Sequence, residues 1–146
     1  MLRVLVLMLW VCPVCFAQSV KVRVLDGKAG RGLPKLSISV QFLYEKPASA
    51  STPLRLETDA NGEAQFSIPE PAPAHLFVVV ALTSEHWRCG CGFMGDTQTV
   101  VDKGFLSTFP TAAKPNTPVN SEPGYIVFVA RPFTFVERLL YPLVKE

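Results

Sequence analysis

Residues 58–69 read Thr58-Asp59-Ala60-Asn61-Gly62-Glu63-Ala64-Gln65-Phe66-Ser67-Ile68-Pro69, a tight turn followed at once by an alternating strand. Asp59 can cap the turn with its side chain, and Gly62 allows a positive φ without steric cost. The apolar residues of the strand that follows are Ala64, Phe66 and Ile68, and polar residues separate them. Leu54 and Leu56 alternate in the same manner before the turn. The stretch therefore predicts a β-hairpin, over about residues 53–58 and 63–69, in a sheet with one buried face.

Short segments of the same kind extend over most of the chain. We expect seven strands, over residues 19–26, 36–45, 53–58, 63–69, 75–83, 97–103 and 125–131. The run from Leu76 to Leu82 is apolar throughout, which is typical of a central strand buried on both faces. Residues 105–124 are rich in Pro, Thr, Asn and Ala and indicate a long loop. Turn signals about every ten residues and the lack of a helical period over these strands predict an all-β, Ig-like sandwich.

The N-terminus has the organisation of an export signal. Arg3 precedes an apolar run, Val4–Phe16, and small residues at Cys15 and Ala17 favour cleavage after Ala17. The run is short for a membrane-spanning helix, which needs roughly 20 residues, although an uncleaved anchor is the alternative. We expect a signal peptide over residues 1–17, a sandwich domain over 18–132 and export to the periplasm or outside the cell. No second long apolar stretch follows, so we expect no transmembrane span after cleavage.

The balance of charge argues against a nucleic-acid partner. The chain has 14 Lys and Arg residues against 12 Asp and Glu residues, and its formal net charge is +2. These charges form no runs, whereas a protein that binds nucleic acid concentrates basic residues on one face. A protein or a glycan is the expected partner, and no cofactor is expected.

The last residues, 133–146, predict a short helix and tail. Thr134 and Glu137 match the capping-box spacing, and Pro142 ends the helix. The helix either covers an open end of the sandwich or makes a weak contact with a membrane surface or a partner, because a helix this short binds a bilayer only marginally.

The opening strand and the Asp-Ala-Asn-Gly turn together resemble the carboxypeptidase regulatory-like domains, which are transthyretin-like β-sandwiches of bacterial exported proteins. The matching residues are Val20, Val22, Val24, Asp26, Thr58, Asp59, Asn61, Gly62, Ala64 and Phe66. The resemblance covers roughly residues 19–83 and implies a non-catalytic accessory or binding module. The chain departs from the family in a loop-rich insertion over residues 86–123, where a specific activity would lie.

The insertion holds the most reactive group of side chains in the sequence. His86, Cys89 and Cys91 could hold a soft metal ion, but their spacing matches no established zinc pattern. Cys89 and Cys91 could also form a structural disulfide, a reducible redox pair or a bond to another chain. The alternative function is therefore thiol-redox or metal handling through this Cys-Gly-Cys loop.

Two aromatic residues of the insertion are candidates for ligand binding. Trp87 and Phe93 could form an exposed aromatic platform for a sugar or a peptide, or Trp87 could instead cover the core. The sequence has no Gly-x-Ser-x-Gly nucleophile motif and no glycine-rich loop before a helix. We expect that the protein is not an enzyme.

Overall fold

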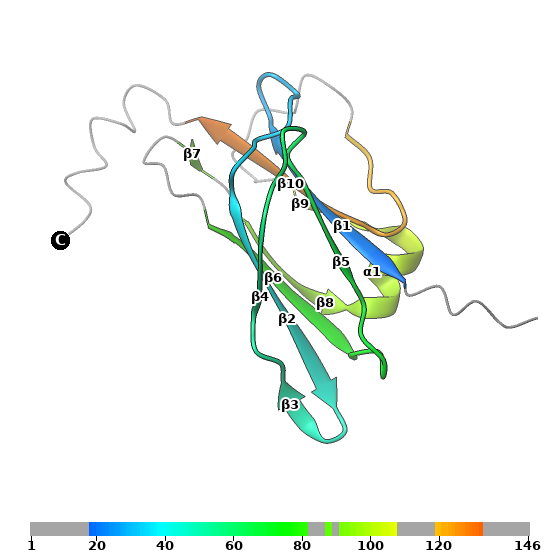
Figure 1. Ribbon diagram of the computed structural model, residues 1–146. Helices are drawn as coiled ribbons and strands as arrows, with labels where there is room; N and C mark the ends of the chain where they lie inside the picture. Colours follow the sequence, from blue (N-terminus) through cyan, green and yellow to red (C-terminus); the bar gives the residue numbers. More distant parts are fainter. Residues whose placement is uncertain (1–17, 82–86, 89–90, 108–118, 133–146) are drawn as a thin grey trace, which may run out of the picture.

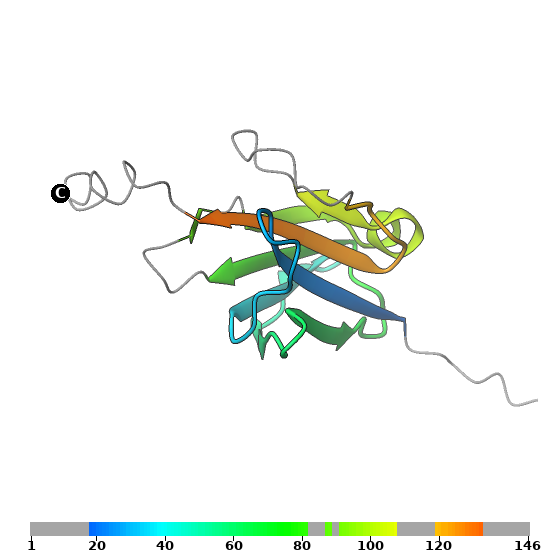
Figure 2. The same cartoon turned by 90° about the horizontal axis from the view of Figure 1, so that it is seen from above.

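The computed structural model describes residues 18–81, 87–88, 91–107 and 119–132, and these form two packed β-sheets (Figure 1). Figure 2 shows the layers from above, with residues 19–26 in blue and 125–132 in orange on one side and residues 37–45 in teal on the other. The structure therefore confirms an all-β sandwich. The predicted signal peptide, the predicted C-terminal helix, His86 and Cys89 lie outside the described residues.

The first sheet, which we call the β1 sheet, has the strand order β5-β1-β10-β7, and β9 also pairs with β10. Its strands are β1 (Ser19–Asp26), β5 (Glu63–Ser67), β7 (Trp87–Arg88), β9 (Phe105–Ser107) and β10 (Tyr125–Pro132). β10 runs parallel to both β1 and β9, so that Val22 pairs with Ile126 and Ile126 with Phe105. β5 is antiparallel to β1.

The second sheet, which we call the β2 sheet, is antiparallel throughout and has the order β3-β2-β6-β8, with β4 also paired to β2. Its strands are β2 (Ser37–Glu45), β3 (Ala48–Ala50), β4 (Leu54–Glu57), β6 (His75–Ala81) and β8 (Gly92–Asp96). Between the strands predicted over residues 36–45 and 53–58, β3 is an additional short hairpin partner of β2.

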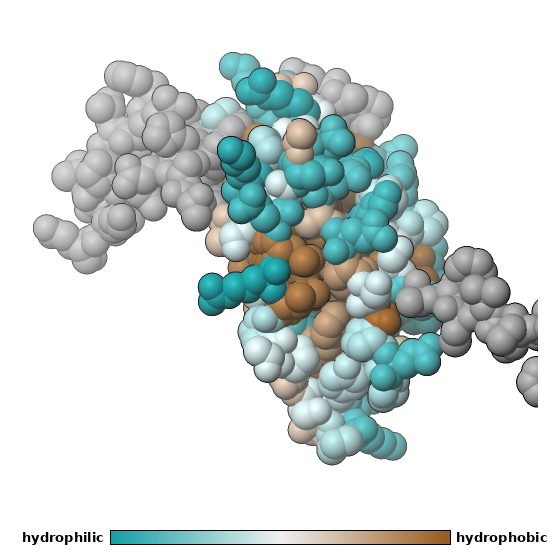
Figure 3. All heavy atoms as spheres, in the orientation of Figure 1, coloured by the Kyte–Doolittle hydropathy of each residue, from teal (hydrophilic) through white to brown (hydrophobic). Residues whose placement is uncertain are grey.

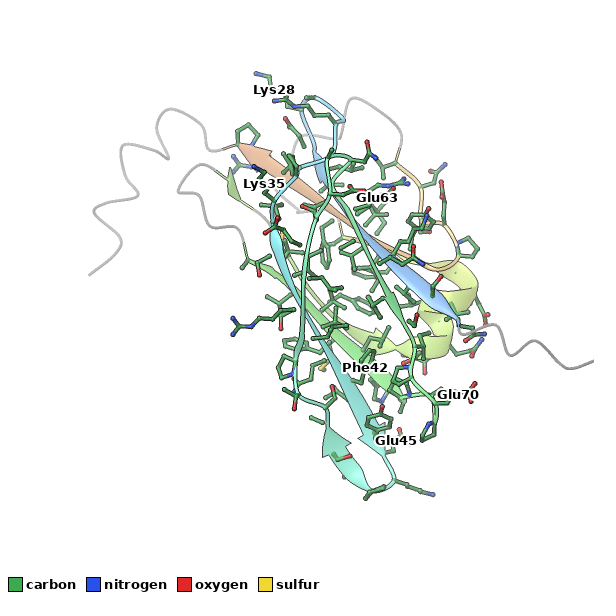
Figure 4. The ribbon with its side chains drawn as sticks, viewed as in Figure 1. Lys28, Lys35, Phe42, Glu45, Glu63 and Glu70 are labelled. Carbon is green, nitrogen blue, oxygen red and sulfur yellow. The ribbon has the colours of Figure 1, made fainter. Side chains whose placement is uncertain are left out.

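The core lies between the two sheets and is built from alternate residues of their strands. Val20, Val22 and Val24 of β1 are fully buried, as are Ile38 and Val40 of β2. The Phe42 ring meets the Phe66 ring from the opposite sheet at 5.9 Å between centroids, and Figure 4 shows Phe42 pointing into the space between the layers. Alternation in β1 and β2 is the sequence pattern that specified this arrangement.

The predicted hairpin over residues 53–58 and 63–69 is wrong, because its two strands belong to different sheets. β4 pairs with β2, whereas β5 pairs with β1. The turn at residues 58–62 is thus a corner between layers, and β4 and β5 diverge from it in Figure 1.

The face of the molecule seen in Figure 1 is partly apolar, because Figure 3, in the same orientation, shows apolar side chains at its centre. β4 contributes Leu54, which is 39% exposed, and the half-buried Leu56.

The sequence predicted burial on both faces for the strand over residues 75–83, but the structure shows it in β10 and not in β6. β6 lies between β2 and β8, but Phe77 on its outer face is 38% exposed. In β10, by contrast, all five residues from Ile126 to Ala130 are buried. The turn after β1 packs over the outer face of β10, where Gly27 lies against Val129.

The predicted strand over residues 97–103 is instead the helix α1 (Thr97–Lys103). Asp96 caps its first turn by accepting a hydrogen bond from the Thr99 backbone N–H at 2.7 Å. Gly104, at φ +70°, ends the helix and donates to Val100 O. Thr97 and Val100, one turn apart, are its buried residues. Among the described residues, no helix is long and apolar enough to cross a membrane.

Candidate functional site

A polar groove lies on the outer face of the β1 sheet, where three loops meet. Its larger hollow has a volume of about 380 Å³. It is lined by Arg23, Leu25, Gly30, Gly32, Asn61, Glu63, Val119, Asn120 and Glu122. A smaller hollow of about 260 Å³ adjoins it, lined by Lys21, Asp59, Glu63, Ala64 and Gln65. Glu63 lines both hollows, so we treat them as one polar groove. Figure 4 shows Glu63 at the end of β5 that lies closest to the turn.

An ion pair between two neighbouring strands forms the base of the polar groove. Arg23 of β1 and Glu63 of β5 are direct partners in the antiparallel ladder. The Arg23 Nε atom donates to Glu63 Oε1 at 2.7 Å, and Nη2 lies 2.5 Å from the same oxygen. The guanidinium group also lies over the Tyr125 ring, with its carbon 4.8 Å from the ring centroid. Arg23 is therefore held in one orientation, with its other N–H groups available to a ligand.

The Asp59 turn forms one end of the polar groove and is internally fixed. Asp59 Oδ1 accepts hydrogen bonds from the backbone N–H groups of Asn61, at 2.8 Å, and Glu63, at 2.9 Å. The turn also packs tightly against the loop after β1, because a Cβ atom added at Gly32 would lie 1.8 Å from Asn61 O. Gly62 has φ +74° and its carbonyl accepts from Val24 N. These two loops therefore present their polar groups in a preorganised arrangement.

The third wall is the segment before β10, which ends the loop-rich insertion. Its side chains at Asn120 and Glu122 are exposed. The backbone is anchored at its end: Gly124 N donates to Val100 O at 3.0 Å and Gly124 O accepts from Lys21 N at 2.9 Å. A Cβ atom at Gly104 would lie 1.9 Å from Glu122 O, which shows how closely this segment packs on the end of α1.

The charges in the polar groove nearly balance. Two cations, Lys21 and Arg23, face three carboxylates, Asp59, Glu63 and Glu122. Besides Gln65 in the smaller hollow, the amides of Asn61 and Asn120 line the larger hollow and supply a donor and an acceptor each. Neither amide side chain has a hydrogen-bond partner within the described part of the chain. The polar groove therefore offers many directional polar groups without a strong field of either sign.

The predicted cysteine site is only partly described. Cys91 is 8% exposed and forms a disulfide bond, and its partner lies outside the described residues. Over the ranges that the structure describes, no group of three His, Cys, Asp or Glu residues could hold a metal ion. The other histidine, His75, lies on the outer face of β6, with Nε2 3.6 Å from Glu45 Oε1. A disulfide-bonded, buried Cys91 favours the structural interpretation over a reactive thiol.

Of the two aromatic residues predicted to bind a ligand, only Phe93 has its side chain among those that the structure describes. Phe93 of β8 is 8% exposed, and the centroid of its ring lies 4.4 Å from that of the Phe105 ring. Phe93 therefore belongs to the core and is not available to a ligand, because its position in β8 points inward. Trp87 lies in β7, and its backbone pairs with that of Pro132 in β10.

The residues of the polar groove carried little signal in the sequence. Arg23 and Glu63 are 40 positions apart and meet only through the β1–β5 ladder. Glu63 was expected to face outward, and the Asp59 turn was expected to be tight. That Glu63 and the Asp59 turn lie beside residues 119–122 follows only from the fold. Comparison with family models, with curated proteins and with solved structures found no match to this chain.

Proposed function

We propose that this chain is an exported, non-catalytic binding module of the prealbumin-like type, similar to the carboxypeptidase regulatory-like domains. The polar groove is its ligand site. The observation that carries this proposal is the meeting of three anchored loops around the fixed Arg23–Glu63 pair. Loops held on a rigid β scaffold are the usual location of binding residues.

The arrangement of the polar groove favours binding over catalysis. Arg23 and Glu63 neutralise each other, and the described residues that line the polar groove include no histidine or cysteine. A Ser-His or Cys-His pair of nucleophile and base would need such residues within hydrogen-bond reach. The resemblance over residues 19–83 implies the same kind of module.

The alternative, thiol-redox or metal handling, would act through Cys89 and Cys91. Cys91 is disulfide-bonded and buried, so a reagent would have little access to its sulfur. We therefore place the binding module first.

Sedimentation with cell-envelope fragments of the source organism tests the proposal. The protein that begins at Gln18 is mixed with the fragments, and the bound fraction is measured. The site variant carries Asn61→Ala and Asn120→Ala, which remove two unpartnered amides from the polar groove. The control variant carries Arg55→Ala and Glu57→Ala, two exposed residues of β4 on the other sheet.

Two lost hydrogen bonds are expected to weaken binding about tenfold in the site variant. The control variant should bind as the original protein does. Equal binding by both variants, or no binding by any of them, contradicts the proposed function. Far-UV circular dichroism confirms that both variants remain folded.

A further inference from the structure

The chemistry of the polar groove identifies the class of its ligand. Its lining combines guanidinium, carboxylate and amide groups, all of which are planar and make directional hydrogen bonds. Among the described lining residues, only Leu25 and Val119 are apolar side chains larger than alanine. An apolar ligand would leave these polar groups without partners, which costs free energy for each group that is shielded from water.

The balance of charge excludes strongly ionic ligands. An anion would approach Arg23 and Lys21, but it would also meet the carboxylates of Asp59, Glu63 and Glu122. A cation would be attracted to the carboxylates but repelled by the basic side chains of Lys21 and Arg23. A neutral ligand with many hydroxyl groups avoids both penalties, because each hydroxyl donates one hydrogen bond and accepts others.

The position of the polar groove argues against an extended peptide. Peptides add to sheets along an unpaired strand edge, or insert side chains into apolar pockets. β5 is an edge strand of the β1 sheet, but at Glu63 its backbone N–H and C=O are already bonded to Asp59, and the polar groove is lined by side chains on the outer face of the sheet. Its ligand must therefore be recognised through the side chains of the protein.

The two hollows adjoin at Glu63, so the site is longer than one compact ligand requires. We infer that the polar groove binds a neutral oligosaccharide of the cell envelope, with consecutive sugar units on either side of the Arg23–Glu63 pair. This inference rests on the proposed function, because it names the ligand of that same site. Asn61 and Asn120 contact the unit in the larger hollow, and Lys21 and Gln65 contact the unit in the smaller one.

Selective destruction of the envelope ligand tests the inference. Envelope fragments are treated either with periodate, which cleaves the vicinal diols of sugars, or with a broad protease. Binding of the original protein is expected to fall at least tenfold after periodate and to be retained after protease. Binding that survives periodate but is lost after protease overturns the saccharide inference and points to a protein ligand.

The two proposals fail in different ways. If the Asn61→Ala, Asn120→Ala variant binds untreated fragments as well as the original protein does, the polar groove is not the site and the proposed function fails. If that variant binds about tenfold more weakly but periodate has no effect, only the ligand class is wrong. Gln65→Ala adds a test of the smaller hollow: about threefold weaker binding is expected, and unchanged binding contradicts a ligand that spans both hollows.

Discussion

Thr58 and Thr97 are both buried threonines, at 3% and 5% exposure, but their hydroxyl groups differ in bonding. The Thr58 hydroxyl donates to Leu33 O at 2.8 Å and accepts from Leu36 N at 2.9 Å. The Thr97 hydroxyl has no hydrogen-bond partner among the described residues. Replacing each by valine keeps the shape of the side chain and removes only the hydroxyl. The same substitution should therefore lower the free energy of unfolding at Thr58 but not at Thr97.

Thr58→Val leaves a buried carbonyl and a partly buried N–H without their partners. Each unsatisfied group costs about 1–3 kcal/mol, so we expect a loss of about 2–4 kcal/mol in the free energy of unfolding. That loss corresponds to a fall in Tm of about 10 °C for a domain of this size. Thr97→Val removes an unsatisfied buried oxygen and should leave the stability unchanged or raise it by about 1 kcal/mol.

Urea unfolding followed by far-UV circular dichroism measures both differences, with the slope m as a check that the transition is unchanged. Thr58→Ser is the matched control, because it keeps the hydroxyl and removes one methyl group. Its expected cost is about 1 kcal/mol, less than that of valine. If Thr58→Val is as stable as Thr58→Ser, the hydroxyl does not hold the corner between the sheets, and the reasoning fails.

Gly62→Ala should lower the free energy of unfolding by about 3 kcal/mol or more, because φ is +74° and a Cβ atom would lie 2.5 Å from Leu33 N. Gly92→Ala is the matched control, because a Cβ atom there would have nothing within 4 Å, and urea unfolding should show a change of less than about 0.5 kcal/mol. The hydrogen bond from the Thr99 backbone N–H lowers the pKa of the Asp96 carboxyl. The ionised carboxylate of Asp96 therefore stabilises the fold above about pH 4, and this stabilisation is lost as the pH falls through the lowered pKa. The stability difference between the original protein and Asp96→Asn should therefore shrink between about pH 5 and pH 2, and a constant difference would contradict this. Alkylation without reduction should leave Cys91 unmodified in an intact-mass measurement, and a labelled Cys91 would show a free thiol.

The sequence predicted the strands whose pattern is local. β1 (Ser19–Asp26) has its predicted bounds, and β2 (Ser37–Glu45) starts one residue later than expected. Both alternate over most of their length, so a period of two was sufficient to identify the strand and its buried face.

Pairing could not be predicted in the same way. The turn at residues 58–62 was identified correctly, but a tight turn between two alternating segments has the same local pattern in a hairpin and in a corner. The outcome depends on distant partners, since β2 pairs with β4 and β1 pairs with β5. The same limit explains the polar groove, whose Arg23 and Asn120 meet only after the chain folds.

The helix α1 was missed because valine at positions 100 and 101 favours strands in a propensity argument. Asp96 before it and Gly104 after it are the capping signals that could have identified the helix. β6 and β10 show a different difficulty. Both are strongly apolar, and only the surrounding structure decides that β10 is covered on both faces while Phe77 of β6 remains exposed.

The central position of β10 has a consequence for how the chain assembles. Val22 of the first strand pairs with Ile126, more than 100 positions later, so the β1 sheet depends on contacts of very long sequence separation. Folding rates fall as this separation grows, because the chain loses the entropy of loop closure before the paired strands contribute any favourable free energy. During synthesis, β1 and β9 both wait for a strand that emerges near the end of the chain. The domain is therefore expected to fold slowly, and the β1 sheet can be completed only after β10 has been synthesised.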